Sequence, residues 1–374
     1  MTLTRGARIT GAVLCAVLAL MAVAWIVRDI RAADGPVPVW EYWSGTASLR
    51  DMVRPTTTST SLVLLLAYGA AAVAALRSAS AASVLIVTGV VTFVLRLPGV
   101  WTVADAPAPE ELRDRALLTT YAALVAGLAL IVVGTAGRRP VPQGEERPAG
   151  PGRGAGVAVF LLLGLQAVIY TAWEIRQPFV FPSGFYPEWF IGGAPLNTPL
   201  IEGPPGWVTV AIILMSLVAA LGAVGGAALA RPLGLIAGGF ILASGALGLA
   251  RIIHFELYER FTDLDVEGQL TLVSQICSLL IGPVVIVLLA RKGVARTPAA
   301  GPWGGPDSWG GGWGDPAPGR PGPEGYQPPQ APGFGPPPGG GFGPPPLLPA
   351  APLVNRGRTG SGGRLRRRSA PATA

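Results

Sequence analysis

One short segment of the chain combines residue types that could bind a ligand or move a proton. Arg251, His254 and Tyr258 are spaced by three and four residues, which places them on one side of a helix. Glu256 and Arg260 have the spacing of a helical ion pair, so we expect the preceding apolar helix to continue through this segment. A ligand site is one interpretation and an interfacial anchor is the other. A chain with one histidine cannot build a histidine-rich zinc site.

A second set of polar candidates lies inside or beside long apolar runs. Gln166 and Gln275 fall near the middles of two runs, where they could form an interhelical hydrogen bond or contact a substrate. Arg96 and Arg251 end apolar runs on the side where few arginines are expected. Asp, Glu and Lys are missing from the middles of the runs, which disfavours an ion-coupled carrier. We recognise no catalytic residue, no metal motif and no cofactor motif in the sequence.

Composition indicates that lipid is the solvent for most of the chain. Half of its 374 residues are hydrophobic (50%) and 13% are charged, and the mean hydropathy is +0.49. Apolar runs of this length cross a bilayer as helices, because a helix satisfies its own backbone hydrogen bonds. We therefore predict an all-α membrane protein with eight transmembrane helices. The predicted spans are Thr10–Val27, Ser61–Leu76, Ala81–Leu97, Leu117–Ala136, Gly154–Trp173, Trp207–Ala230, Leu233–Ala250 and Leu270–Ala290.

The distribution of arginine predicts how these spans are oriented. Arg5 and Arg8 precede the first span, and further basic residues follow the last span at Arg291 and Lys292. If every span crosses, the basic loops share one side with both termini, which we predict to be cytoplasmic in a bacterial plasma membrane. The first span could instead be a signal peptide. We favour an uncleaved anchor, because Arg28 follows the apolar run directly, without a small-residue cleavage site.

The arginines also indicate an internal repeat. Three arginines that end or follow apolar runs recur at similar spacing: Arg77, Arg96 and Arg138 correspond to Arg231, Arg251 and Arg291. We therefore predict two tandem four-helix halves, at 1–139 and 154–296, joined by a cytoplasmic linker at 140–153. The alternative is that the positive-inside rule alone generates the regular spacing.

Small residues and aromatic residues predict how the helices pack and where the membrane ends. Glycines recur every four residues at Gly222 and Gly226 and at Gly234 and Gly238, which indicates close helix packing. We expect the sixth and seventh spans to form a tight hairpin joined only by Arg231–Pro232. Aromatic residues crowd two loops on the acidic side, around Trp40–Trp43 and Phe179–Phe190. They could anchor the protein at the interface, which we favour, or cover an outward-facing pocket.

Residues 297–374 form a tail of different composition, rich in Pro and Gly with single aromatics. Such a sequence cannot bury a core, so we predict a disordered cytoplasmic tail. It could recruit a cytoplasmic protein through its Pro runs, or it could be a solvated linker. Its end should be attracted to anionic membrane lipids, and we expect no nucleic-acid partner. The basic residues at this end are Arg364, Arg366, Arg367 and Arg368.

This layout of apolar spans and a Pro/Gly-rich tail resembles that of uncharacterised multi-pass membrane proteins of high-GC actinobacteria. The resemblance covers layout and composition and implies no residue roles. Three functions are compatible with the sequence. A non-enzymatic scaffold or envelope-associated protein is our first hypothesis, and a carrier or binding protein for an apolar or lipid-like solute is the alternative. A membrane enzyme acting on lipid substrates has the least support.

Overall fold

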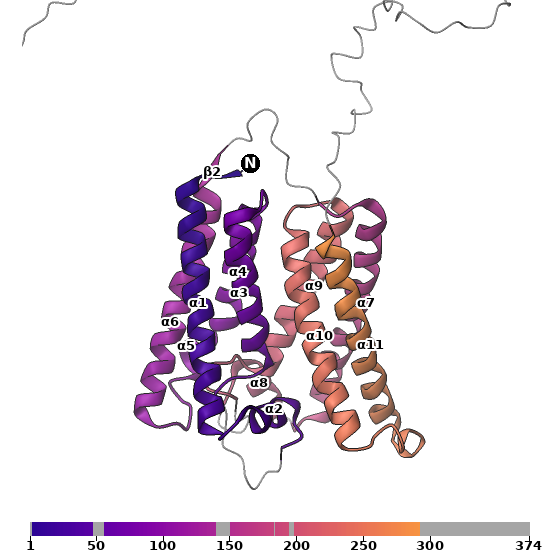
Figure 1. Cartoon of the computed structure of the whole chain (residues 1–374). Coiled ribbons are helices and arrows are strands. Elements are labelled where there is room, and N and C mark those ends of the chain that lie inside the picture. Colours follow the sequence, from indigo (N-terminus) through magenta and orange to yellow (C-terminus); the bar gives the residue numbers. More distant parts are fainter. Residues whose placement is uncertain (1, 48–55, 140–149, 183, 194–197, 292–374) are drawn as a thin grey trace, which may run out of the picture. The chain divides into compact units, whose positions relative to one another are not determined.

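The computed structural model describes residues 2–47, 56–139, 150–182, 184–193 and 198–291. Within these ranges eight helices are long and apolar enough to cross a membrane (Figure 1). The predicted all-α membrane fold is therefore confirmed, and the chain is an integral membrane protein. The spans are α1 (Arg5–Ala32), α3 (Ser59–Arg77), α4 (Ala81–Arg96) continued by α5 (Gly99–Thr102), α6 (Glu110–Ala136), α7 (Arg153–Val180), α9 (Pro205–Gly225), α10 (Ala230–His254) and α11 (Val266–Ala290).

Several spans are longer than their apolar runs, because polar residues at their ends satisfy exposed backbone groups. Thr4 caps α1, with its hydroxyl accepting from the Ala7 amide, and the Asp265 carboxylate caps α11 by accepting from Gly268. Short elements complete the described part of the chain. They are α2 (Pro36–Ser44), α8 (Phe185–Ile191), the 3-10 turn η2 (Phe261–Asp263), and the strands β1 (Thr2–Leu3) and β2 (Arg138–Arg139).

The eight spans form two four-helix halves with the same order of contacts. In the first half α1 packs on α3 and α6, and α4 packs on the same two helices. In the second half α7 packs on α9 and α11, and α10 packs on those two. The halves meet where α10 contacts α3 and α4, and where α4 contacts α9. The contacts therefore group the spans four and four, in the order that the two predicted halves would have.

Glycines bring the third and fourth spans of each half into close contact. A Cβ on Gly89 of α4 would lie 2.5 Å from the carbonyl oxygen of Gly127 on α6. A Cβ on Gly245 of α10 would lie 2.3 Å from the backbone nitrogen of Leu279 on α11. Because lipid is as apolar as the side chains, such van der Waals contact is the main force between membrane helices.

The predicted hairpin between the sixth and seventh spans needs correction. Arg231 and Pro232 lie in the first turn of α10, and the connection from α9 is formed by residues 226–229. Gly226 adopts a left-handed conformation (φ 66°) and ends α9. Its backbone lies against Gly150, where an added Cβ would be 2.5 Å from the Gly226 carbonyl oxygen, rather than against α10. Gly222 does face the hairpin, because an added Cβ would lie 3.1 Å from that of Ala230.

Gly234 and Gly238 pack mainly against α11 rather than against α9. A Cβ on Gly234 would lie 2.5 Å from a methyl group of Leu289, and one on Gly238 would lie 3.1 Å from Ile286. The prediction of close helix packing at these glycines holds, but the partner helix was wrong. A repeat of small residues marks a narrow helix face, and the sequence does not say which neighbour that face meets.

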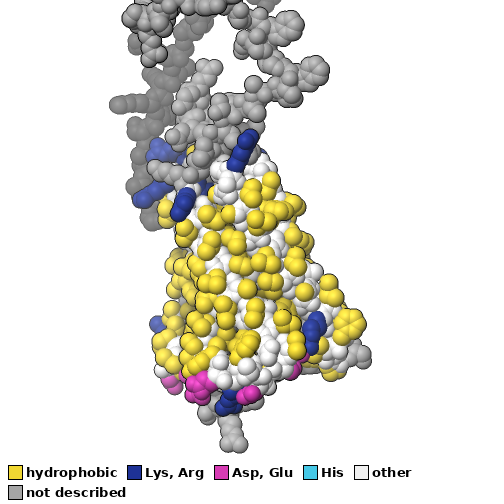
Figure 2. Space-filling view, turned by 90° about the vertical axis from the view of Figure 1, so that its right-hand side faces the viewer, with side chains coloured by type: hydrophobic (Ala, Val, Ile, Leu, Met, Phe, Trp, Pro, Cys, Tyr) yellow, Lys and Arg dark blue, Asp and Glu magenta, His cyan; other side chains and the backbone are white. Residues whose placement is uncertain are grey.

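Charge separates the two ends of the bundle (Figure 2). The described Asp and Glu side chains gather at the end that carries α2 and α8, here called the acidic end, where arginines such as Arg96 and Arg176 accompany them. The opposite end, which carries β1 and β2, has arginines without described carboxylates and is here called the basic end. At the basic end, arginines bond the free carbonyls of helix C-termini. Arg8 donates to Leu76, and Arg231 donates to Leu289 at 2.6 Å. Between the ends the surface is apolar, as lipid contact requires.

Candidate binding pocket and the buried polar network beside it

Asp29, in the last turn of α1, is a buried carboxylate with five hydrogen-bond donors around it. The residue is 1% exposed. The backbone amides and hydroxyls of Thr56 and Thr57 donate to it at 2.6–2.8 Å, and Arg28 adds a fifth bond at 2.8 Å. An anion near a helix C-terminus is disfavoured by the helix dipole. The hydrogen-bond donors and the guanidinium offset this unfavourable interaction of the Asp29 carboxylate with the helix dipole. They also hold the start of α3 against the end of α1.

Glu202 is a second buried carboxylate, and it joins the two halves. It precedes α9 in the second half, yet its partners belong to the first half: Ser61 donates to it at 2.5 Å and the Thr58 amide at 3.4 Å. Burial raises the pKa of Glu202 above its ordinary value, while the charge of Arg96 and the hydrogen bonds from Ser61 and Thr58 lower it. The Glu202 site is therefore electrostatically costly and must be held by the surrounding fold.

Arg96 completes this network from α4. It is 8% exposed, donates to the carbonyl oxygen of Ile201, and reaches the Ser61 hydroxyl at 3.5 Å. The sequence singled out Arg96 because it lies where the positive-inside rule places few arginines. The structure supplies the reason: its guanidinium is buried at the acidic end beside Glu202, where it contacts the second half of the chain.

The six hydroxyl residues at 56–61 supply most donors to the two carboxylates, and the sequence analysis overlooked them. The predicted second span begins at Ser61, the last of the six, and leaves the other five outside it. Their signal was visible, because six consecutive Ser and Thr residues directly before an apolar run are unusual. What the sequence lacked was the partner, since Glu202 lies 141 residues from Ser61.

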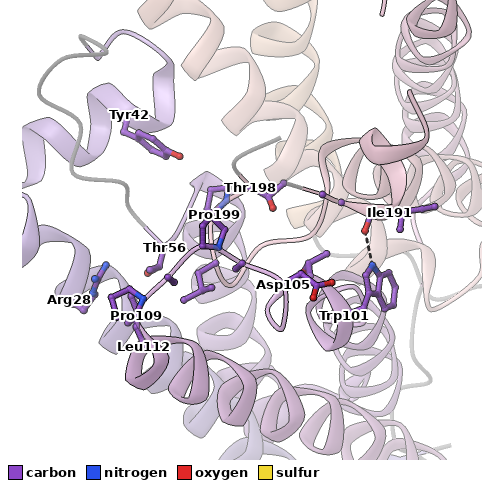
Figure 3. A pocket seen from close by; sticks show the side chains of 17 residues that line it. Arg28, Tyr42, Thr56, Trp101, Asp105, Pro109, Leu112, Ile191, Thr198 and Pro199 are labelled. Atoms are coloured by element: carbon purple, nitrogen blue, oxygen red, sulfur yellow. Dashed lines mark hydrogen bonds between the residues drawn. The ribbon is translucent and has the colours of Figure 1, made fainter. Parts of the chain in front are cut away.

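A pocket opens at the acidic end, next to this network (Figure 3). Its volume is about 320 Å³, within the range of sites for small ligands. Thr56 and Leu200 belong to its lining, and the Ile201 amide donates to the Thr56 carbonyl at 3.2 Å. Segments of both halves therefore build the pocket, and a backbone hydrogen bond joins them next to it.

Trp101 of α5 forms a wall of the pocket and holds α8 in place. Its indole nitrogen donates to the carbonyl oxygen of Ile191, the last residue of α8, at 2.7 Å (Figure 3). Its ring also packs edge-on against Trp207 of α9, with ring centroids 6.0 Å apart. A small ligand would meet a wall whose position is set by both halves.

The lining is mixed in character, as is usual for a site that orients an amphipathic molecule. Leu112, Ile191 and Leu200 supply apolar surface. Arg28 and Asp105 supply opposite charges, and Figure 3 shows these two side chains well apart in the pocket.

Some aromatic residues of the acidic end line the pocket, and others are exposed as interfacial anchors would be. Tyr42 lines the pocket, and Trp43 donates to the Thr57 carbonyl at 2.9 Å. Trp40 and Phe179 are 43% and 84% exposed, as interfacial anchors would be.

Arg251, His254 and Tyr258 are not assembled into a site, and the helix predicted to continue through them is wrong. Helix α10 ends at His254, and Glu256 has a positive φ of 52°, which breaks the helix. Tyr258 is 58% exposed, and His254 lies exposed with its ring against that of Phe255. Helical spacing beyond the apolar run was weak evidence, because tertiary packing no longer supports the helix there.

The rest of the cluster is also dispersed. In the described ranges no ion pair joins Glu256 and Arg260. Arg251 is exposed, and its aliphatic chain lies beside Gly45, just after α2. Neither Arg251, His254 nor Tyr258 lines the pocket.

The two glutamines lie on different helices and do not bond each other. Gln166 is fully buried, and its amide nitrogen donates to Ser278 of α11 at 2.9 Å, so the interhelical hydrogen bond is present with another partner. Gln275 packs against Gly248 of α10. The side-chain carbonyl oxygens of both glutamines are buried and lack partners within the described ranges. The tail arginines 364 and 366–368 lie outside those ranges.

Within the described part of the chain, no group of three His, Cys, Asp or Glu side chains is arranged to hold a metal ion. No protein-family model, curated protein or solved structure matches the chain. The functional assignment therefore depends on the geometry of the pocket and on the membrane fold.

Proposed function

We propose that this integral membrane protein binds a small amphipathic solute in the pocket at its acidic end, as a carrier or a binding protein. The observation that supports the proposal is a pocket of about 320 Å³ built from both halves, with apolar walls and two separate charges. Because Thr56 lies both in the lining and in the buried Asp29 site, an occupant would contact residues fixed by the rigid network.

Filling the pocket tests this proposal. Leu112 of α6 lines the pocket, so Leu112→Trp should occlude it, while Leu118→Trp changes a lipid-facing residue that is 71% exposed. Each full-length protein is purified in mild detergent, and the small molecules that co-isolate are compared by mass spectrometry. We expect a molecule that accompanies the wild type and Leu118→Trp and is lost from Leu112→Trp. Identical sets of molecules from all three proteins would contradict the proposal.

We also propose that the basic end faces the cytoplasm of a bacterial plasma membrane, with both termini on that side. The arginines at Arg8, Arg77, Arg138 and Arg231 support this orientation through the positive-inside rule. Reporter fusions that fluoresce only in the cytoplasm test it when they are placed before Met1 and after residue 296. Fluorescence from one fusion without the other would contradict an even number of crossings.

We infer further that the halves are repeats of one ancestral unit. Trp25 of α1 donates to Thr119 of α6 at 3.2 Å, and Trp173 of α7 donates to Ser274 of α11 at 3.2 Å. The same donor and acceptor types therefore bridge the first and fourth spans of each half. If the halves are repeats, Trp25→Phe and Trp173→Phe should destabilise the protein to a similar degree in thermal unfolding.

The scaffold hypothesis concerns the tail at 297–374, which lies outside the described ranges. Its Pro runs and single aromatics remain the basis for proposing a cytoplasmic protein partner. Affinity purification of the full chain and of a chain ending at residue 296 tests this proposal. A protein partner that is lost with the tail would support it, and an unchanged set of partners would contradict it.

A further inference from the structure

The charges in and around the pocket do not balance. Arg28 is the positive charge of the lining, but it is already paired with the buried carboxylate of Asp29 at 2.8 Å. Asp105 is the negative charge of the lining; it is exposed, and no ion pair with it occurs in the described ranges. One carboxylate therefore faces the pocket without a compensating cation.

A second carboxylate lies behind the pocket wall at Gly193. Oε2 of Glu188, in α8, is buried and has no hydrogen-bond partner among the described residues. A Cβ built on Gly193, which lines the pocket, would lie 3.4 Å from this oxygen. An unpartnered buried carboxylate oxygen is costly, and a nearby positive charge would offset that cost.

An aromatic ring shares the pocket lining with Asp105. Trp101 precedes it by four residues, and both side chains line the pocket (Figure 3). A tryptophan ring attracts ammonium groups, most strongly where water is excluded. The apolar residues Leu112 and Leu200 supply surface for the rest of a ligand.

From these observations we propose that the pocket selects an organic cation: an ammonium group beside Asp105 and Trp101, carried on a short apolar body. The inference rests on the proposed solute-binding function and names its ligand class. A small anion would meet Asp105 without a free partner, since Arg28 is engaged by Asp29. Among the described residues, a bare metal ion would find no group of three His, Cys, Asp or Glu side chains to bind it.

Three probes of nearly equal shape separate charge selection from simple occupancy: choline, its neutral carbon analogue 3,3-dimethylbutan-1-ol, and the anion 3,3-dimethylbutanoate. Their binding to the full-length protein in detergent is measured by isothermal titration calorimetry. We expect choline to bind about tenfold or more tighter than the alcohol, and the anion to bind most weakly. Asp105→Asn should remove most of the advantage of choline, and Asp105→Glu should restore it.

The control variant is Asp114→Asn, which removes an exposed carboxylate of α6 that is not part of the lining. It should leave all three affinities unchanged. Equal binding of choline and the alcohol, or choline binding unaffected by Asp105→Asn, would overturn the organic-cation assignment. If Leu112→Trp nevertheless abolishes binding of the alcohol, the proposed solute-binding function stands. Failure of all three probes to bind overturns the cation assignment, while the co-isolation experiment judges the proposed function independently.

Discussion

Replacing Asp29 by asparagine changes one oxygen of a buried acceptor into a donor and tests whether the carboxylate organises the acidic end. The two Asp29 oxygens accept from two backbone amides, two hydroxyls and one guanidinium. An asparagine side chain keeps one acceptor oxygen. Its NH₂ group must face either the amides of Thr56 and Thr57 or the guanidinium of Arg28, and all of these are donors.

The expected loss follows from these contacts. If the NH₂ group turns toward Arg28, the guanidinium can reach water because its side chain is 37% exposed, and the Thr56 hydroxyl can rotate to accept. The three remaining donors then bond a neutral oxygen instead of a charged one, and each weakens by about 1 kcal/mol. If the group turns the other way, two buried amides lose their acceptor, at about 1–3 kcal/mol each. The side chain takes the less costly arrangement, so we expect a destabilisation of about 2–4 kcal/mol.

The assay is the fraction of monodisperse protein that survives heating in detergent, measured by size-exclusion chromatography for the wild type and two variants. Asp34→Asn is the matched control, because Asp34 is exposed and has a positive φ of 55°, which asparagine tolerates. Asp29→Asn should lose its monodisperse peak at a clearly lower temperature, and Asp34→Asn should match the wild type. Equal survival of all three proteins would refute the claim that the carboxylate and its donors stabilise the acidic end.

Three further changes test other parts of the structure. Because burial raises the pKa of Glu202, the folded protein keeps the carboxyl proton at pH values where the unfolded chain has released it. The stability of the wild type should therefore be greatest below the ordinary pKa of 4.5 and should fall as pH rises through the raised pKa. Glu202→Gln should flatten this dependence in thermal unfolding from pH 4 to 8. Gly245→Ala should cost about 3 kcal/mol or more, because its Cβ would meet the backbone of α11, whereas Gly164→Ala, with open space around it, should be neutral in the same assay. Gln166→Leu should change stability by less than about 1 kcal/mol, because the loss of one hydrogen bond is offset by the removal of a buried oxygen without a partner in the described ranges. A loss above about 3 kcal/mol in thermal unfolding would show instead that this hydrogen bond organises α7 and α11.

The glycines show what a local sequence pattern can predict about helix packing and what it cannot. The spacing of Gly234 and Gly238 correctly indicated a helix face of small residues. The same spacing could not say that the face meets α11, because the neighbour of a helix face is set by the rotation of the helix in the bundle. The close contacts with a neighbouring backbone at Gly89 and Gly245 were not predicted at all. Each is one glycine opposite a backbone on another helix, and a single glycine has no pattern.

Some residues of the candidate site could likewise be predicted from the sequence, and others could not. Arg96 could be found in the sequence, because a charge at the end of an apolar run on the acidic side is an exception to a general rule. Asp105 and Trp101 carried no signal, since an acidic or aromatic residue in an outer loop is ordinary. Their importance comes from lining one pocket with Leu200, which lies about a hundred residues away in the chain.

The sequence by itself determined the solvent of this protein, the number of its spans and the opposite charges of its two ends. These properties depend on hydrophobicity and charge summed over neighbouring residues, and lipid forces each apolar run into a helix. Only the tertiary structure decided that Asp29 is enclosed by Thr56 and Thr57, that Glu202 joins the halves, and that α10 ends at His254. Such pairings depend on how distant helices are rotated and packed, and a buried charge can remain only where the folded chain brings donors to it.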